Sequence, residues 1–174
     1  MKALVVYESL FGNTARIGEG IAASLRANGL EVEHAPLSEV SAGAAEADLL
    51  VVGAPTHAHG MSRAGTRKAA VEDKKNTFPA AAAMPGVRDW MEDLPSGSGR
   101  LAAAFDTRFD KPRFLTGSAA KTIAGRLEQR GYRLVCPPES FFVTGENTLE
   151  GGETEHAAAW GTDLADRASA GAGR

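Results

Sequence analysis

The chain has 174 residues, a length that suits one domain with a single core. Its formal net charge of −3 provides none of the basic excess that attracts a nucleic-acid backbone, so we expect no nucleic-acid partner. No apolar run approaches the roughly 18 to 20 residues that span a bilayer, and we expect a cytoplasmic protein with no membrane partner. The single cysteine, Cys136, provides neither an internal disulfide nor a metal-ligand pair.

Four segments in the first two thirds of the chain have the patterns of β-strands. Residues 3–7, ALVVY, form a short apolar run rich in β-branched side chains, and residues 47–55, ADLLVVGAP, repeat this pattern. Such runs predict strands that are buried on both faces. Residues 30–37 alternate between polar and apolar side chains and predict a further strand, as does the apolar run at 100–106.

Apolar residues recur at helical spacing in three segments, which predict helices at 13–28, 115–131 and 153–168. The last helix begins with acidic residues that suit the positive end of a helix dipole, and we expect it to bury Trp160 and Leu164. Residues 132–145 predict a fifth strand. Its two consecutive prolines should break it, because proline cannot donate to a ladder.

Strands that alternate with helices at this spacing predict right-handed crossovers and a parallel sheet. The expected fold class is therefore a doubly wound α/β domain with helices on both faces, covering residues 1–168 as one unit. Residues 74–98 interrupt this alternation of strands and helices with prolines, glycines and a short helix near 87–94. We interpret this segment as an insertion in the third crossover, and we expect residues 169–174 to form a mobile tail.

A small polar loop, SLFGNT, follows the first predicted strand at residues 9–14. In doubly wound sheets, ligands bind outside the carboxyl ends of the strands where the strand order reverses, and this loop forms one lip of that crevice. Its glycine permits a tight turn, and the following helix presents unpaired N–H groups. Neither GxxxxGK[ST] nor GxGxxG is present, which argues against triphosphate and dinucleotide sites. These features favour a monophosphate held by neutral donors.

At these residues the chain resembles the flavodoxin family, which binds FMN. The family's phosphate loop is [ST]-x-T-G-x-T, and the residues that fit it here are Ser9, Leu10, Gly12, Asn13 and Thr14. Phe11 replaces the threonine whose hydroxyl would donate to the phosphate. The loss of that bond should weaken phosphate binding by about 1.5 to 3 kcal/mol.

The resemblance extends over nearly the full chain and implies a five-stranded sheet of order 2-1-3-4-5 with FMN as cofactor. It also implies that two later loops flank the flavin ring. These loops comprise Pro55, Thr56, His57, Ala58, His59 and Gly60 after the third strand, and Phe105, Asp106, Thr107 and Arg108 after the fourth. His57 stands where an aromatic residue is common in the family, so Phe109 or Phe114 would have to cover the other face of the ring.

Basic residues gather around the site that these loops would form. The cations there are Arg63, Arg67, Lys68, Arg108, Lys111, Arg113 and Lys121, against Asp106 and Asp110. Positive charge lowers the energy of an anionic reduced flavin. We therefore expect a higher flavin potential than in a low-potential electron carrier. The partner should be anionic: an acidic redox protein, a nicotinamide nucleotide or a carboxylated substrate.

Several of these residues have more than one possible role. The two histidines of the second loop make a poor metal site without a nearby cysteine or carboxylate, and we expect no metal and exposed imidazoles. Asp106 either orients the ring or caps a turn. The chain contains no GxSxG nucleophile elbow, and we assign no catalytic residue. Trp90 and Trp160 are expected in the core, and Cys136 in a buried strand.

The favoured function is one-electron transfer between protein partners by a bound FMN. The first alternative is an FMN-dependent NAD(P)H oxidoreductase of the quinone or porphyrinogen type, which the basic surroundings and residues 74–98 favour. A second alternative is a module of the same fold that binds no flavin and acts in protein interaction, as Phe11 and the missing aromatic pair suggest. Whether the protein is an enzyme, and whether it is a monomer or a homodimer, stays open.

Overall fold

The computed structural model describes residues 1–44, 46–57, 60–63, 65, 67–68 and 86–172. The predicted site residues Ala58 and His59 lie outside this part of the chain, as do residues 74–85 of the predicted insertion. No helix in the described part is long and apolar enough to cross a membrane.

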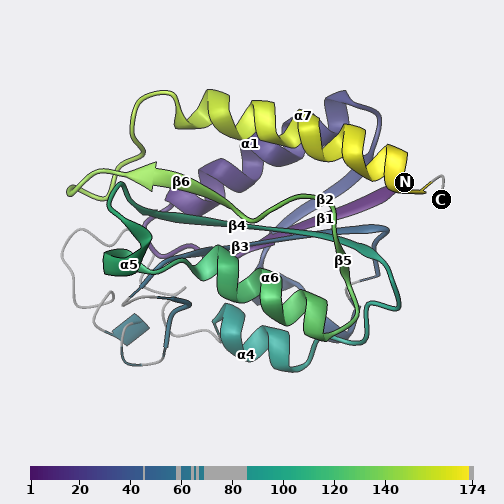
Figure 1. Ribbon diagram of the computed structural model, residues 1–174, viewed down its shortest axis with the longest axis horizontal. Coiled ribbons are helices and arrows are strands. Elements are labelled where there is room, and N and C mark those ends of the chain that lie inside the picture. The colour runs from purple at the N-terminus through teal and green to yellow at the C-terminus, as the bar shows by residue number, and fades with distance from the viewer. Residues whose placement is uncertain (45, 58–59, 64, 66, 69–85, 173–174) are drawn as a thin grey trace.

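A parallel sheet forms the centre of the structure (Figure 1). Its strands are β1 (Lys2–Tyr7), β2 (Glu31–Pro36), β3 (Leu49–Pro55), β4 (Leu101–Phe109), β5 (Arg133–Leu134) and β6 (Glu139–Val143). They lie in the order β2-β1-β3-β4-β5, and β6 also pairs with β4. All of these pairings are parallel. The predicted α/β class and the order 2-1-3-4-5 are confirmed.

The predicted fifth strand consists of two segments on one edge of the sheet. β5 pairs with Leu101 and Ala102 at the start of β4, whereas β6 pairs with Phe105–Phe109 at its end. The two consecutive prolines, residues 137–138, lie between the segments. The predicted break is therefore correct, and its cause is that neither proline can donate to β4.

Helices cover both faces of the sheet. They are α1 (Asn13–Ala27), α4 (Val87–Glu92), α5 (Arg113–Thr116), α6 (Ala119–Gln129) and α7 (Glu153–Ala172), with 3-10 turns at Leu37–Glu39 and Ala42–Ala44. α1 and α7 lie on one face, and α4 and α6 lie on the other (Figure 1). The predicted helix at 115–131 begins later than expected, because Ser118 caps α6 by accepting a hydrogen bond from the backbone N–H of Lys121.

The last helix is longer than the sequence analysis predicted. α7 continues past residue 168 to Ala172, and the Gly171 carbonyl accepts a hydrogen bond from Arg133 Nη2 at 2.9 Å. Residues 169–172 are therefore helical and do not belong to an irregular tail. Residues 173–174 lie outside the described chain.

Two apolar clusters, one on each side of the sheet, form the core. Alternate residues of β1 enter different clusters: Val5 packs with the α1 and α7 side chains, and Val6 with those of α4 and α6. Trp160 and Trp90 are each 7% exposed and lie on opposite sides, so both are core residues as predicted. Cys136 is also buried, but it lies in the bend between β5 and β6 and not in a strand as predicted.

A close contact between β3 and β4 fixes the place of Phe105. Gly53 and Phe105 are partners in the register, and a Cβ atom on Gly53 would lie 2.1 Å from Phe105 Cζ. The same ring meets Phe141 and Trp160 edge to face, with centroids 6.0 and 6.2 Å away. Phe105 is fully buried in the α1/α7 cluster, so its side chain is a core group and does not face a flavin site.

Replacing Gly53 by alanine should lower the free energy of unfolding by about 2 to 3 kcal/mol, because the added methyl group overlaps the Phe105 ring. Urea unfolding followed by circular dichroism measures this change. Gly125→Ala is the matched control, since Gly125 lies in α6 and a Cβ there meets no atom within 4 Å. An equal loss in both variants would contradict the account of the Gly53 contact.

Candidate functional site

The polar loop after β1 has the shape expected of an anion-binding loop. Gly12 adopts the left-handed conformation, with φ 85°, at the N-cap of α1. A residue with a side chain would be strained there, so this glycine is required by the backbone. The loop lies at the carboxyl end of β1, where the strand order reverses between β2 on one side and β3 on the other.

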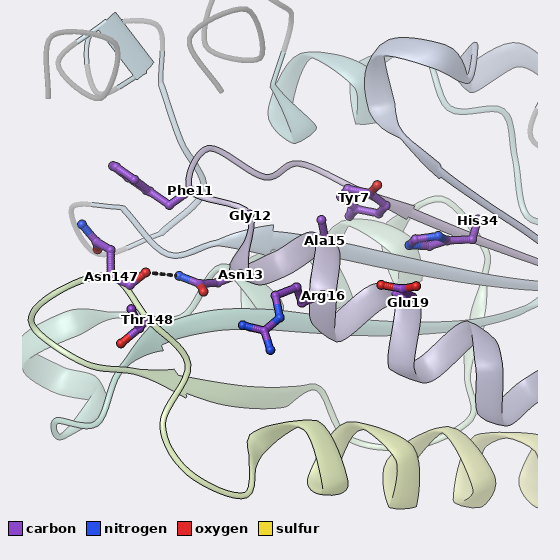
Figure 2. Close-up of a pocket in the computed structure, with 10 residues that line it drawn as sticks. All are labelled: Tyr7, Phe11, Gly12, Asn13, Ala15, Arg16, Glu19, His34, Asn147 and Thr148. Atoms are coloured by element: carbon purple, nitrogen blue, oxygen red, sulfur yellow. Dashed lines mark hydrogen bonds between the residues drawn. The ribbon is translucent and has the colours of Figure 1, made fainter. Parts of the chain in front are cut away.

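The predicted polar side chains of this loop make hydrogen bonds to protein groups. Asn13 Nδ2 donates to the Asn147 carbonyl at 2.7 Å (Figure 2), and the Thr14 and Thr107 hydroxyls are 2.8 Å apart. Ser9 Oγ accepts a hydrogen bond from the Ala15 N–H at 3.3 Å. These bonds therefore fix the shape of the loop. Asn13 directs an amide hydrogen to the protein, whereas the Ser9 hydroxyl acts as an acceptor in its bond and keeps its own hydrogen to donate.

The backbone of the loop supplies most of the available donors. The N–H groups of residues 10–14 meet no acceptor among the described residues, and the first bond that the helix makes to the loop runs from Arg16 N to the Gly12 carbonyl. Successive unpaired N–H groups at a helix N-terminus attract an anion. The loop can thus hold a phosphate through its backbone, and this donor set does not need a threonine in place of Phe11.

A cavity of about 440 Å³ adjoins the loop on the side of α1 (Figure 2). Asn147 and Thr148 border one end of it, and the ring of Phe11 points away from α1. The Tyr7 and His34 rings stack at the other end, with centroids 4.9 Å apart. The sequence analysis did not identify Asn147 or Thr148. No signal near residue 13 could have done so, because Asn13 and Asn147 are 134 positions apart.

Two described residues of the second predicted loop, His57 and Gly60, are paired. His57 and Gly60 exchange two backbone hydrogen bonds, of 2.8 and 3.0 Å. His57 is not the exposed residue that the sequence analysis expected: its Nε2 atom is buried and has no partner among the described residues. Burial lowers the pKa of His57, so the imidazole is neutral at neutral pH.

The carboxylate of Asp106 is a structural group. Asp106 is 0% exposed, and its Oδ2 atom accepts hydrogen bonds from Thr56 Oγ1 at 2.8 Å, Ser118 Oγ at 2.8 Å and the Ala120 N–H at 3.0 Å. Thr56 Oγ1 in turn accepts from the Ala119 N–H at 2.8 Å. Of the two roles considered for Asp106, this geometry is that of a cap for α6, and the side chain does not reach the surface.

Arg108 also points inward. It is 7% exposed, and its Nη1 atom donates to the carbonyls of Phe109 and Lys111 and to the Thr116 hydroxyl. Its guanidinium lies 5.0 Å from the centre of the Phe142 ring. Arg108 therefore holds the connection between β4 and α5. Two large apolar side chains here are exposed, Phe109 at the end of β4 and Phe114 in α5, at 43% and 82%.

The charge around the site differs from the count made on the sequence. Arg67 is buried and pairs with Asp89 at 3.1 Å, and Arg108 is buried as described above, so neither adds to the surface charge. The side chain of Arg113 lies outside the described part. The exposed cations from this region in the described chain are Arg63, Lys68, Lys111 and Lys121.

No family model and no curated protein matches this chain. Solved structures do match. A flavodoxin from the domain Archaea shares 20% identity at a TM-score of 0.66, with 97% of this chain and 99% of that chain covered. Flavodoxin 1 from Bacillus cereus shares 21% identity at a TM-score of 0.68, with 95% and 98% covered. The fold is flavodoxin-like.

This flavodoxin-like fold also occurs as one part of a longer protein. The rubredoxin oxygen:oxidoreductase from Desulfovibrio gigas shares 18% identity at a TM-score of 0.63. The match covers 99% of this chain but 37% of that one. At such identities the comparison establishes the fold, and the site has to be argued from its own residues.

Replacing Asp106 by alanine should lower the free energy of unfolding by about 2 to 4 kcal/mol, because two hydroxyls and one N–H group lose their acceptor. Chemical denaturation measures the loss. Asp110→Ala is the control, since Asp110 is an exposed acidic residue after the end of β4. If both variants are as stable as the original protein, Asp106 does not hold this edge of the sheet.

Proposed function

We propose that this protein binds FMN and transfers electrons to or from a redox protein. The observation that carries the proposal is the set of N–H groups at residues 10–14 that meet no acceptor in the described part of the chain. They lie beside Gly12, which has the left-handed conformation, at the reversal of the strand order. A phosphate monoester suits this site, because the loop has no lysine for a triphosphate. The flavodoxin-like fold supports a flavin in particular.

The residues of this chain would have distinct tasks. The backbone of the loop would bind the phosphate, and Ser9, Asn13 and Thr14 would hold the loop in shape through their hydrogen bonds to protein groups. His57 Nε2, which is buried without a partner in the described part, would meet a polar edge of the ring. When bound, FMN supplies the capacity to accept and release electrons one or two at a time.

The surface charge supports an acidic partner. Arg63, Lys68, Lys111 and Lys121 are exposed in segments adjoining the proposed site, whereas Asp110 is the exposed acid of the segment after β4. Complementary charge speeds encounter and is screened by salt. The same cations suit a nicotinamide nucleotide, so an FMN-dependent NAD(P)H oxidoreductase is the second candidate. Steady oxidation of NADPH by the purified protein without a partner would select this second candidate.

Titration of FMN and riboflavin against the purified protein, followed by flavin fluorescence, tests the proposal. We expect FMN to bind at least tenfold more tightly than riboflavin, because only FMN brings a phosphate to the backbone donors. Equal affinities would contradict the phosphate site. Uptake of neither compound would favour the alternative of an interaction module without flavin.

Phe11→Thr should tighten FMN binding by about tenfold, because the added hydroxyl can donate to the phosphate beside the backbone donors. Phe11→Val is the control, since valine has the shape of threonine but no hydroxyl. Riboflavin affinity should be the same in both variants. Equal FMN affinities of the two variants would show that position 11 contributes nothing through a hydroxyl.

A further inference from the structure

Glu8 is a buried carboxyl group immediately before the phosphate loop. It follows β1, its N–H donates to the Gly53 carbonyl at 3.0 Å, and its side chain lies inside the protein at 6% exposure. Oε2 accepts a hydrogen bond from the Val87 N–H at 2.9 Å. Oε1 is buried and has no partner among the described residues. A carboxylate in this state is costly to bury, which calls for a role.

Three side chains converge on Gly86, the N-cap of α4. A Cβ atom on Gly86 would lie 2.3 Å from Arg67 Nη1, 2.8 Å from Ser62 Oγ and 3.0 Å from Glu8 Oε2. Arg67 Nη1 also donates to Ser62 Oγ at 3.2 Å. Glu8 therefore lies where three parts of the chain meet: the end of β1, the segment at Ser62 and the start of α4.

Among the described residues, this cluster holds two carboxyl groups, Glu8 and Asp89, against one cation, Arg67. Arg67 already pairs with Asp89 at 3.1 Å, and Asp89 Oδ2 accepts from the Gly86 N–H as well. Burial raises the pKa of Glu8, and Asp89 adds to this, whereas Ser62, the Val87 N–H and Arg67 lower it. Glu8 thus serves the cluster as a hydrogen-bond acceptor for Val87, and its negative charge is poorly compensated.

We propose that Glu8 is a positioning residue of the flavin site, which ties the strand end that carries the phosphate loop to α4. This inference rests on the proposed FMN binding. The backbone donors of residues 10–14 can converge on a phosphate only if the end of β1 keeps its place. The bond from Val87 N to Glu8 Oε2 joins that end to α4 across 79 residues of sequence.

Two substitutions remove this bond from opposite sides. Glu8→Ala removes the acceptor, and Val87→Pro removes the donor. Proline is tolerated at the first position of a helix, and Gly86 already has the extended backbone, with φ −85° and ψ 176°, that precedes proline. Val87→Ala keeps the N–H and loses the buried side chain, so it is the matched control for Val87→Pro. Glu8→Gln keeps an acceptor and removes the charge.

The affinity for FMN should divide these variants into two groups. We expect Glu8→Ala and Val87→Pro each to weaken FMN binding by about tenfold, and the double variant to be little weaker than either single one, because both remove one bond. The FMN affinities of Glu8→Gln and Val87→Ala should stay within about threefold of the affinity of the original protein. The same is expected of Glu128→Gln, an exposed control on α6. Circular dichroism verifies that each variant is folded at the titration temperature.

The pH dependence separates the charge of Glu8 from its hydrogen bond. A carboxyl group with a raised pKa contributes stability below its unfolded value, and this contribution is lost as the pH rises through the folded value. The original protein should therefore lose stability and FMN affinity relative to Glu8→Gln as the pH rises from 5 to 8. The phosphate of FMN titrates equally in both measurements and cancels in the comparison.

The outcomes distinguish the inference from the function on which it rests. If the original protein binds no FMN, the proposed function fails, and the inference fails with it. If the original protein binds FMN but folded Glu8→Ala and Val87→Pro bind it equally well, Glu8 has no positioning role and the proposed function stands. If Val87→Ala binds FMN as weakly as Val87→Pro does, the effect comes from the lost packing of the Val87 side chain, and the inference is overturned. If Glu8→Ala does not fold, the FMN affinity of Val87→Pro and the pH comparison with Glu8→Gln test the inference instead.

Discussion

The buried carboxylate of Asp106 is the interaction on which the carboxyl edge of the sheet depends. It accepts three hydrogen bonds, from the residue after β3, from the residue that caps α6 and from the first turn of α6. The next residue, Thr107, continues the network: its carbonyl accepts from the Thr56 N–H at 2.9 Å, and its hydroxyl meets that of Thr14. One connected set of bonds therefore joins all three loops that would form the flavin site.

In this arrangement the side chains and the backbone have different roles. The polar side chains at the edge bond to other protein groups, whereas the backbone N–H groups of residues 10–14 meet no acceptor within the described ranges. A site built in this way is fixed in shape before a ligand arrives, because moving a loop would leave buried groups without partners. The apolar layer beneath it has the same effect, since the contact between Phe105 and Gly53 sets how β3 and β4 lie against each other.

The sequence predicted the sheet well because its signals are local. Continuous apolar runs such as 3–7 and 47–55 can be buried on both faces only inside a parallel sheet, and the glycine in SLFGNT marks a turn that only glycine makes easily. The resemblance to the flavodoxin family then supplied the strand order. α7 was predicted too short, because the bond between Arg133 and Gly171 that secures its last turn joins residues 38 positions apart.

The direction of polar side chains at the site could not be predicted. Thr14 and Asn13 were taken as ligand donors, yet their partners lie 93 and 134 positions away. Arg67 and Arg108 were counted as surface charge, although the first pairs with Asp89 and the second with backbone carbonyls and Thr116. Spacing along a chain identifies which residues reach one edge of a sheet. It does not show which of them turn toward each other and which face a ligand.

The central claim is that the backbone N–H groups of residues 10–14 hold a phosphate. The most direct measurement is a proton–nitrogen correlation spectrum of the labelled protein, recorded with FMN and separately with riboflavin. The account predicts large downfield shifts of the Gly12, Asn13 and Thr14 amide protons with FMN, and much smaller shifts with riboflavin, because hydrogen bonds to a charged oxygen are short and strong. Amide shifts that are the same with both compounds, or that fall elsewhere in the chain, would contradict it.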